Sequence, residues 1–280
     1  MHVYKTDEGK ETIRGAVREV YACCPVPAEP KYLDTGAFGS THCLVMGPDD
    51  GPPLVLLHGS GSNSAAWLGY VTALAGQFRI LALDIPGHPG LSDERPLSPE
   101  GGCRRKWLGQ AVKELGINHF FICGMSLGSW FALDYGIAFP AQVRGMCLLS
   151  TGGIVPPRFG FFLRILPFLF LGERGRRAVN RIVHGPLPVD PAVDEFSFLL
   201  FRHYRHVREE LPIFKDEQLG SIPFPLLYIG GEQDVMLKTR ETARRIRKQV
   251  PHAEIEVIQD AGHVLLGMGR RVERFFRSCD

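Results

Sequence analysis

Short hydrophobic runs and helix-like segments alternate along most of this chain. Apolar runs of strand length lie at 54–57, 79–83, 120–125, 143–149, 224–230 and 254–258. Segments with helical spacing of apolar positions lie between or after them, at 65–75, 104–115, 127–139, 238–249 and 264–277. Continuous apolar runs of this length are typical of strands buried on both faces. The alternation therefore predicts an α/β fold with a mostly parallel central sheet and helices on both faces.

Two parts of the chain depart from this alternation. Residues 154–217 are rich in phenylalanine and arginine, and we interpret them as a helical cap inserted into a core of residues 37–153 and 218–280. Residues 1–36 contain a helix-like segment and are interpreted as an N-terminal helical extension. The apolar stretch 159–171 is too short to span a bilayer and is interrupted by Arg164 and Pro167. We expect it to form a lid over a site, with interfacial association as the alternative.

Composition argues against a nucleic-acid-binding protein, a metal-binding protein and a secreted protein. The 32 basic and 30 acidic side chains leave a net charge of +2, so nothing indicates a nucleic-acid partner. The seven cysteines are an odd number without metal-type spacing, and no metal site is predicted. The first ten residues are polar, unlike a secretory signal. We therefore expect reduced cysteines and a cytoplasmic protein.

One apolar run ends in the pattern Gly-x-Ser-x-Gly. A predicted strand at 120–125 is followed by Ser126, and a helix-like segment begins at Leu127. A nucleophile elbow has this order of strand, sharp turn with a nucleophile, and helix. Gly124 and Gly128 suit such a turn, because side chains there would crowd a strained backbone. The pattern alone fits a plain small-residue turn equally well, so the other motifs decide.

A loop of small residues follows the predicted strand at 54–57. It begins with His58 and continues through Gly59, Ser60 and Gly61. Backbone N–H groups in such a loop can face a ligand, as an oxyanion hole requires. The competing interpretation is a strand-to-helix turn in which Ser62 or Asn63 caps the next helix.

A carboxylate and a histidine follow two late strands. Asp234 comes after the run at 224–230, and His263 comes after the run at 254–258. Because the carboxyl ends of parallel strands meet at one edge of a sheet, we expect both side chains to lie near Ser126. Glu232 is the alternative acid. Asp84 ends a strand at the same edge, and we expect it to hold its own loop.

The order of serine, aspartate and histidine on this scaffold resembles the α/β-hydrolase family. The resemblance extends from about residue 40 to the end, the cap excepted. Its four motifs are His58-Gly59-Ser60-Gly61, Gly124-Met125-Ser126-Leu127-Gly128, Gly231-Glu232-Gln233-Asp234 and Ala261-Gly262-His263. Within the family, the chain looks most like the bacterial carboxylesterases related to naproxen esterase.

The resemblance implies a role for each motif residue. Ser126 would be the nucleophile, His263 its general base, and Asp234 the group that orients the imidazole. The backbone N–H groups of Leu127 and Ser60 would form the oxyanion hole. Neither a metal ion nor an organic cofactor is required.

The substrate is less well defined than the triad. We expect a small-molecule carboxylic ester with an apolar or aromatic group, cleaved through an acyl-enzyme. An apolar pocket is expected from Met125, Trp130, Phe162, Phe198 and the other phenylalanines of the cap. Trp130 stands where relatives often have a small residue, and it either narrows the pocket or packs the elbow helix.

Two other functions remain open. One is a carbon–carbon bond hydrolase with the same triad, in which Arg158, Arg164, Arg202 or Arg205 binds a substrate carboxylate. The other is a non-catalytic receptor for a small molecule on the same fold. Monomer and homodimer are both compatible with the sequence.

Overall fold

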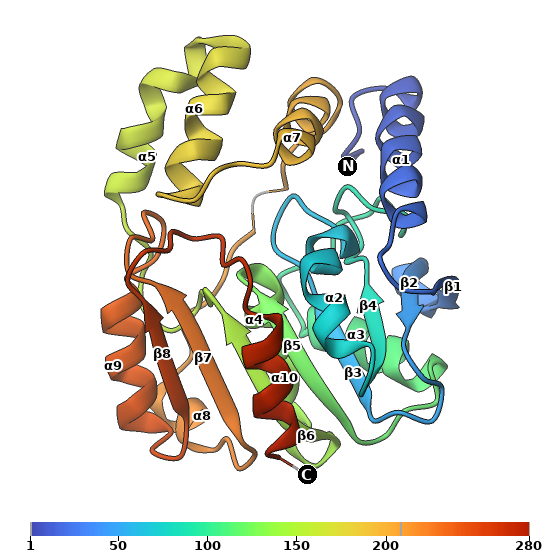
Figure 1. The fold of residues 1–280 in the computed structure, drawn as a ribbon, viewed down its shortest axis with the longest axis vertical. Coiled ribbons are helices and arrows are strands. Elements are labelled where there is room, and N and C mark those ends of the chain that lie inside the picture. Colours follow the sequence, from blue (N-terminus) through green and yellow to red (C-terminus); the bar gives the residue numbers. More distant parts are fainter. Residues whose placement is uncertain (1, 208, 280) are drawn as a thin grey trace.

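Eight strands form one central sheet in the computed structural model, which describes residues 2–207 and 209–279 with the side chains of Phe162, Arg164 and Leu169 excepted. The strands are β1 (Ala28–Asp34), β2 (Ser40–Met46), β3 (Pro53–Leu57), β4 (Arg79–Leu83), β5 (Phe120–Met125), β6 (Val143–Leu149), β7 (Leu226–Gly231) and β8 (Glu254–Ile258). Their order across the sheet is β1-β2-β4-β3-β5-β6-β7-β8 (Figure 1). The pairs β1–β2 and β2–β4 are antiparallel, and all other neighbours are parallel.

Helices cover both faces of this sheet. They are α1 (Asp7–Ala22), α2 (Leu68–Leu74), α3 (Cys103–Glu114), α4 (Leu127–Ala138), α8 (Asp216–Gly220), α9 (Thr239–Gln249) and α10 (Gly269–Arg277). Alternate residues of each central strand point to opposite faces. Val55 and Leu57 of β3 accordingly join a cluster with α3, α4 and α9, whereas Leu54 and Leu56 join a cluster with α1, α2 and α10. The sheet is thus buried on both sides, as its continuous apolar strands predict.

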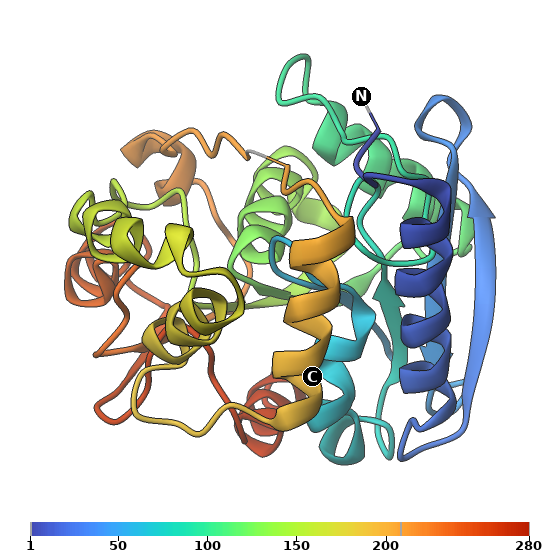
Figure 2. The ribbon, with the colours of Figure 1, turned by 90° about the horizontal axis from the view of Figure 1, so that it is seen from above.

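The cap lies over the carboxyl ends of the parallel strands (Figure 1). It contains α5 (Gly160–Ile165), the short 3₁₀ helix η4 (Leu166–Phe170), α6 (Gly172–His184) and α7 (Pro191–His203). Seen from above, α7 lies between α6 and α1 (Figure 2). We propose that residues 154–217 be treated as the cap and the flanking segments as the core.

Two predicted elements differ from the structure. Residues 28–34, assigned to a helical extension, form β1 at the edge of the sheet; among them only Leu33 is buried, so no apolar alternation marks this strand. The last helix begins at Gly269 instead of residue 264, since Gly267 has a φ of +72° and interrupts the helical backbone.

The N-terminal segment is attached to the end of α7. The backbone N–H of Lys5 donates to the carbonyl of His203 at 2.8 Å, and that of Arg205 donates to Val3 at 2.7 Å. Tyr4 and Tyr204 form an antiparallel bridge between these hydrogen bonds. The exit from the cap is therefore held by residues at the other end of the chain.

Candidate active site

Ser126 lies on a strained turn between β5 and α4. Its φ of 51° and ψ of −106° fall outside the regions that non-glycine residues prefer. The turn fits only because its neighbours lack side chains. A Cβ on Gly124 would lie 2.3 Å from the amide nitrogen of Ser129, and one on Gly128 would lie 2.1 Å from the carbonyl oxygen of Leu57. The two glycines let β5, α4 and β3 approach closely enough to form the predicted elbow.

The two other predicted triad side chains meet Ser126 in one hydrogen-bonded series. The Oγ of Ser126 lies 3.0 Å from Nε2 of His263, and Nδ1 of His263 lies 2.7 Å from Oδ2 of Asp234. A carboxylate only accepts, so Nδ1 carries the proton and Nε2 is left to accept from the serine hydroxyl. Asp234 is 1% exposed and His263 11% exposed in their side chains. This arrangement can withdraw a proton from Ser126 as its oxygen attacks.

Backbone groups fix the carboxylate. Its second oxygen, Oδ1 of Asp234, accepts from the N–H groups of Met236 at 2.7 Å and Leu237 at 2.9 Å. Arg158, at the start of the cap, donates its own N–H to the carbonyl of Met236 and its Nε to that of Leu237. Glu232, the alternative acid, instead pairs with Arg240 on the surface.

The histidine loop is held by two residues that sequence reasoning missed. Ser150, just beyond β6, donates its hydroxyl to the carbonyl of His263 at 2.8 Å. Its φ of 46° makes it the second non-glycine residue with positive φ among those described. The N–H of His263 donates to the carbonyl of Val183 in α6 at 3.0 Å. The position of Ser150, a polar residue at the end of a predicted strand, is a signal that could have identified it. The contact of Val183 uses only its backbone and leaves no signal in the sequence.

The glycine-rich loop lies beside the nucleophile. A Cβ on Gly59 would lie 3.6 Å from Cβ of Ser126. His58 is fully buried and orients this loop, because its Nδ1 lies 2.7 Å from the carbonyl of Gly59 and its Nε2 accepts from the N–H of Ile85. Burial lowers the pKa of His58 to about 4, helped by the nearby His88. His58 is therefore neutral near pH 7 and has a structural contact on each ring nitrogen.

The end of this loop caps the next helical segment. The side chain of Asn63 accepts from the N–H of Ala65 at 2.9 Å, so Asn63 is the cap, and the oxyanion-hole role of the loop stays a prediction. His88 contacts the loop as well. Its Nδ1 accepts from the N–H of Gly61 at 3.1 Å, and its Nε2 lies 3.3 Å from Oε1 of Glu209. A buried ring thus links the loop to the segment that returns from the cap.

Asp84 holds the loops behind the site, as expected. The fully buried carboxylate accepts from the N–H groups of Ser64 and Leu91 and from the hydroxyl of Tyr21. Its Oδ2 also lies 3.0 Å from Nδ1 of His42. Burial alone would raise the pKa of Asp84. The contact and charge of His42, with further hydrogen bonds, outweigh burial and hold this pKa well below its usual range.

Trp130 packs the elbow helix. It is 6% exposed, it stacks on Phe214 at 5.3 Å, and its Nε1 donates to the carbonyl of Pro212. The guanidinium of Arg104 lies over the Trp130 ring, 4.9 Å from the ring centre. Through these contacts Trp130 packs the elbow helix, and its place in a substrate pocket stays a prediction.

The other predicted pocket residues are placed unevenly. Met125 is half-buried directly before Ser126. Phe198 lies on α7 under the guanidinium of Arg202, 4.2 Å from its ring centre. Phe162 belongs to α5, but its side chain lies outside the described residues. Phe159 and Phe170 are 77% and 83% exposed, so these two rings do not line an enclosed pocket.

The arginines proposed for a substrate carboxylate have other partners. Arg158 contacts the acid loop, Arg202 lies 3.4 Å from Glu173, and Arg205 donates to carbonyls of the N-terminal segment. The side chain of Arg164 is not described. Arg176 of α6, which the sequence did not single out, donates to His206, and a Cβ on Gly61 would lie 3.1 Å from the His206 ring. The Nε of Arg176 is buried and has no hydrogen-bond partner among the described residues.

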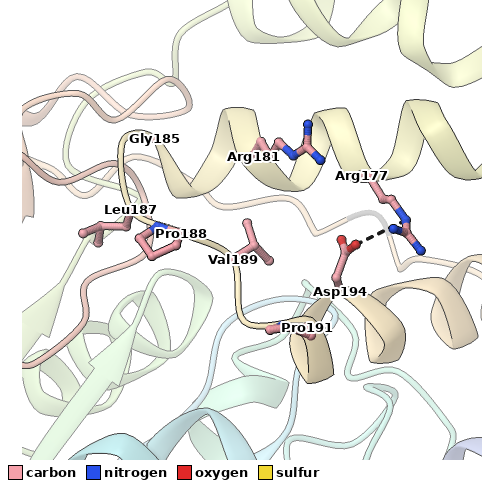
Figure 3. Close-up of a pocket in the computed structure, with 8 residues that line it drawn as sticks. All are labelled: Arg177, Arg181, Gly185, Leu187, Pro188, Val189, Pro191 and Asp194. Atoms are coloured by element: carbon pink, nitrogen blue, oxygen red, sulfur yellow. Dashed lines mark ion pairs between the residues drawn. The ribbon is translucent and has the colours of Figure 1, made fainter.

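A groove of about 380 Å³ lies within the cap and is lined by residues between Arg177 and Asp194 (Figure 3). Arg177 and Arg181 border it from α6, and Asp194 borders it from α7, with Arg177 and Asp194 paired at 3.4 Å. None of the triad residues lines it. Among the described residues, no group of three histidine, cysteine, aspartate or glutamate side chains is placed to hold a metal ion.

Comparison with known proteins identifies the family. The sequence profile of the alpha/beta hydrolase family matches residues 54–277. The chain belongs to the alpha/beta hydrolase family. A carboxylesterase, nap, of Bacillus subtilis is 29% identical over 266 residues, covering 91% of this chain and 88% of that protein. The crystal structure of naproxen esterase from Bacillus subtilis superimposes with a TM-score of 0.86 at 26% identity, covering 97% of this chain and 99% of that one.

A second kind of hydrolase shares the fold. The 2-hydroxy-6-oxo-6-phenylhexa-2,4-dienoate hydrolase from Rhodococcus superimposes with a TM-score of 0.71 at 24% identity, covering 90% of this chain and 99% of that one. The comparisons confirm the family, the fold and the class of enzyme predicted from the sequence, a carboxylesterase-type hydrolase. No helix of the described residues is long and apolar enough to cross a membrane.

Proposed function

We propose that this protein hydrolyses carboxylic esters through an acyl-enzyme on Ser126. The observation that carries the proposal is the hydrogen-bonded series from Ser126 through His263 to Asp234, at 3.0 and 2.7 Å, on a strained elbow. The similarity to carboxylesterases supports an ester as the substrate.

Each step of the reaction follows from these atoms. The Oγ of Ser126 attacks the ester carbonyl while Nε2 of His263 takes its proton. The carbonyl oxygen becomes an oxyanion, and the N–H groups of Leu127 and Ser60 stabilise it. The imidazolium, stabilised by Asp234, then protonates the departing alcohol. In the second half, His263 takes a proton from the water that attacks the acyl carbon. It returns this proton to Oγ of Ser126 as the bond to the acyl group breaks, which releases the acid and the free serine.

The test compares hydrolysis of p-nitrophenyl esters of graded chain length by the wild type and by Ser126→Ala. Loss of the nucleophile is expected to lower kcat by about 10⁴-fold or more. The matched control is Ser60→Ala, which keeps the backbone N–H assigned to the oxyanion hole and so retains most activity. If Ser126→Ala retained wild-type turnover, the assigned nucleophile would be wrong.

A specific observation keeps the carbon–carbon hydrolase as the second candidate. Arg176 brings a cation to the neighbourhood of the glycine-rich loop, where a substrate carboxylate could bind, and its buried Nε has no partner among the described residues. Cleavage of a chromophoric ring-fission diketone, lost in Arg176→Met and kept in Arg177→Met, would support it. Arg177 is the matched control because it lies next in sequence, is 62% exposed and pairs with Asp194.

The receptor hypothesis has a distinct outcome. A small molecule that raised the unfolding temperature of well-folded wild type without being turned over would favour it. The acyl chain preference and the cytoplasmic location remain predictions from the sequence, and monomer and homodimer are both still compatible with it.

A further inference from the structure

The outer part of the cap exposes large apolar side chains in one continuous segment. Residues 159–171 form α5, η4 and the turn into α6, at one edge of the cap (Figures 1 and 2). Five of the large apolar side chains described there are at least half exposed: Phe159 at 77%, Leu163 at 61%, Leu166 at 50%, Phe170 at 83% and Leu171 at 58%. Scattered exposed apolar residues are ordinary, but such a concentration marks an interaction surface.

The same region concentrates positive charge. Residues 158–184 contain six arginines and one glutamate, a net charge of +5. Because the whole chain carries +2, all other residues together carry −3. Arg174 and Arg181 lie on the solvent side of α6, and Arg181 borders the groove in Figure 3. Residues 158–184 therefore combine an excess of positive charge with exposed apolar side chains. Residues 238–249, which include α9, carry the same net charge of +5, but none of their described large apolar side chains is exposed.

This segment has a fixed conformation of its own. Gly175 of α6 packs so closely on η4 that a Cβ there would lie 1.8 Å from the carbonyl oxygen of Phe168. Arg158 attaches its start to the loop of Asp234, and Val183 attaches its end to the loop of His263. The exposed rings thus belong to a built hairpin that contacts both catalytic loops.

We propose that this hairpin, residues 158–184, docks on the surface of an anionic lipid bilayer. Exposed phenylalanine and leucine enter the boundary between headgroups and acyl chains, and the exposed Arg174 and Arg181 bind phosphates, as in interfacial helices. A second copy of the chain fits less well, since the exposed Arg174 and Arg181 of two hairpins would repel each other across a two-fold axis. A nucleic acid would leave the exposed rings without a role. Docking in this way turns the cap, and beneath it the carboxyl ends of the parallel strands, toward the lipid (Figure 1).

The test measures co-sedimentation of the whole protein with phosphatidylcholine vesicles that contain or lack phosphatidylglycerol. Binding is expected only to the anionic vesicles and to weaken with salt. The double variant Phe159→Ser/Phe170→Ser should reduce the partition coefficient by about tenfold or more per ring. The double variant Arg174→Gln/Arg181→Gln should reduce it by about fivefold per arginine.

Two controls keep the proposal falsifiable. Arg244→Gln/Arg247→Gln removes two exposed arginines from α9, and Tyr32→Ser removes a ring that is 58% exposed on β1; both should bind like wild type. Absence of wild-type binding, or equal loss in these controls, overturns the proposal. So does a wild-type dimer that Phe159→Ser/Phe170→Ser converts to a monomer in light scattering, which would assign the surface to a second copy.

Discussion

Replacing Asp84 with asparagine tests how far the loops behind the active site depend on one buried carboxylate. One oxygen accepts from the N–H of Ser64 at 2.8 Å and the hydroxyl of Tyr21 at 2.7 Å. The other accepts from the N–H of Leu91 at 2.9 Å and lies 3.0 Å from His42. Asparagine keeps one acceptor, but it places an NH₂ group against the N–H of Leu91.

The cost follows from these contacts. Two retained hydrogen bonds change from a charged to a neutral acceptor, which costs about 1 kcal/mol each. The buried N–H of Leu91 loses its acceptor, which costs about 1–3 kcal/mol. In its other tautomer, His42 can accept a hydrogen bond from the new NH₂ group, so this contact adds no further cost in stability. We expect Asp84→Asn to lower the free energy of unfolding by about 3–5 kcal/mol, a large part of the usual total of about 5–15 kcal/mol.

Urea unfolding at pH 7, followed by circular dichroism, measures this loss. The matched control is Asp93→Asn in the same loop, whose carboxylate is 26% exposed and accepts mainly from Arg95. Partly exposed pairs contribute little, so the control should lose less than about 1 kcal/mol. If the two variants lost equal stability, the reasoning from buried acceptors would be refuted.

Two further predictions concern the elbow and its loop. Gly128→Ala should destabilise the fold by about 1–3 kcal/mol and lower esterase activity, because the new Cβ would lie 2.1 Å from the backbone oxygen of Leu57. Gly109→Ala in α3 should stabilise the fold by about 0.5–1 kcal/mol, because its Cβ would lie 3.8 Å from the nearest atom, in Tyr135. Thermal unfolding measures both variants, and a similar change in the two would contradict this reasoning. Because the pKa of His58 is lower in the folded chain, the unfolded chain binds more protons below about pH 6.5, and stability should fall by about 3 kcal/mol as the pH drops toward 4. His58→Gln should show a shallower loss between pH 7 and 4.5 in urea unfolding; an unchanged slope would disprove this assignment.

The turn at Ser126 and the meeting of its side chain with His263 and Asp234 could be expected from the sequence, because a local motif and a rule of parallel sheets indicate them. Glycines two residues on either side of Ser126 encode the turn itself, and the rule that parallel strands end at one edge brings Asp234 and His263 to it. Both histidine contacts, at 3.0 and 2.7 Å, lie where this rule expects them.

The remaining features depend on contacts that the sequence does not encode locally. The strand β1 is polar, contains Pro30 and buries only Leu33, so its pairing with β2 decides its structure. The exposure of Phe159 and Phe170 depends on how α5 and η4 pack on α6. A phenylalanine-rich segment is compatible with a pocket lining and with an outer surface alike, and only tertiary packing distinguishes them.

The bridge between Tyr4 and Tyr204 also determines which segments must be moved together when the cap is transferred to another protein. Residues 2–5 hold the C-terminal end of α7 through backbone hydrogen bonds, and Lys5 adds a side-chain bond to the carbonyl of Phe201. A cap exchanged as one insertion between β6 and β7 would arrive without this attachment. A transplant into a related hydrolase must therefore carry two separate pieces of chain, the cap and the N-terminal segment that fastens its exit.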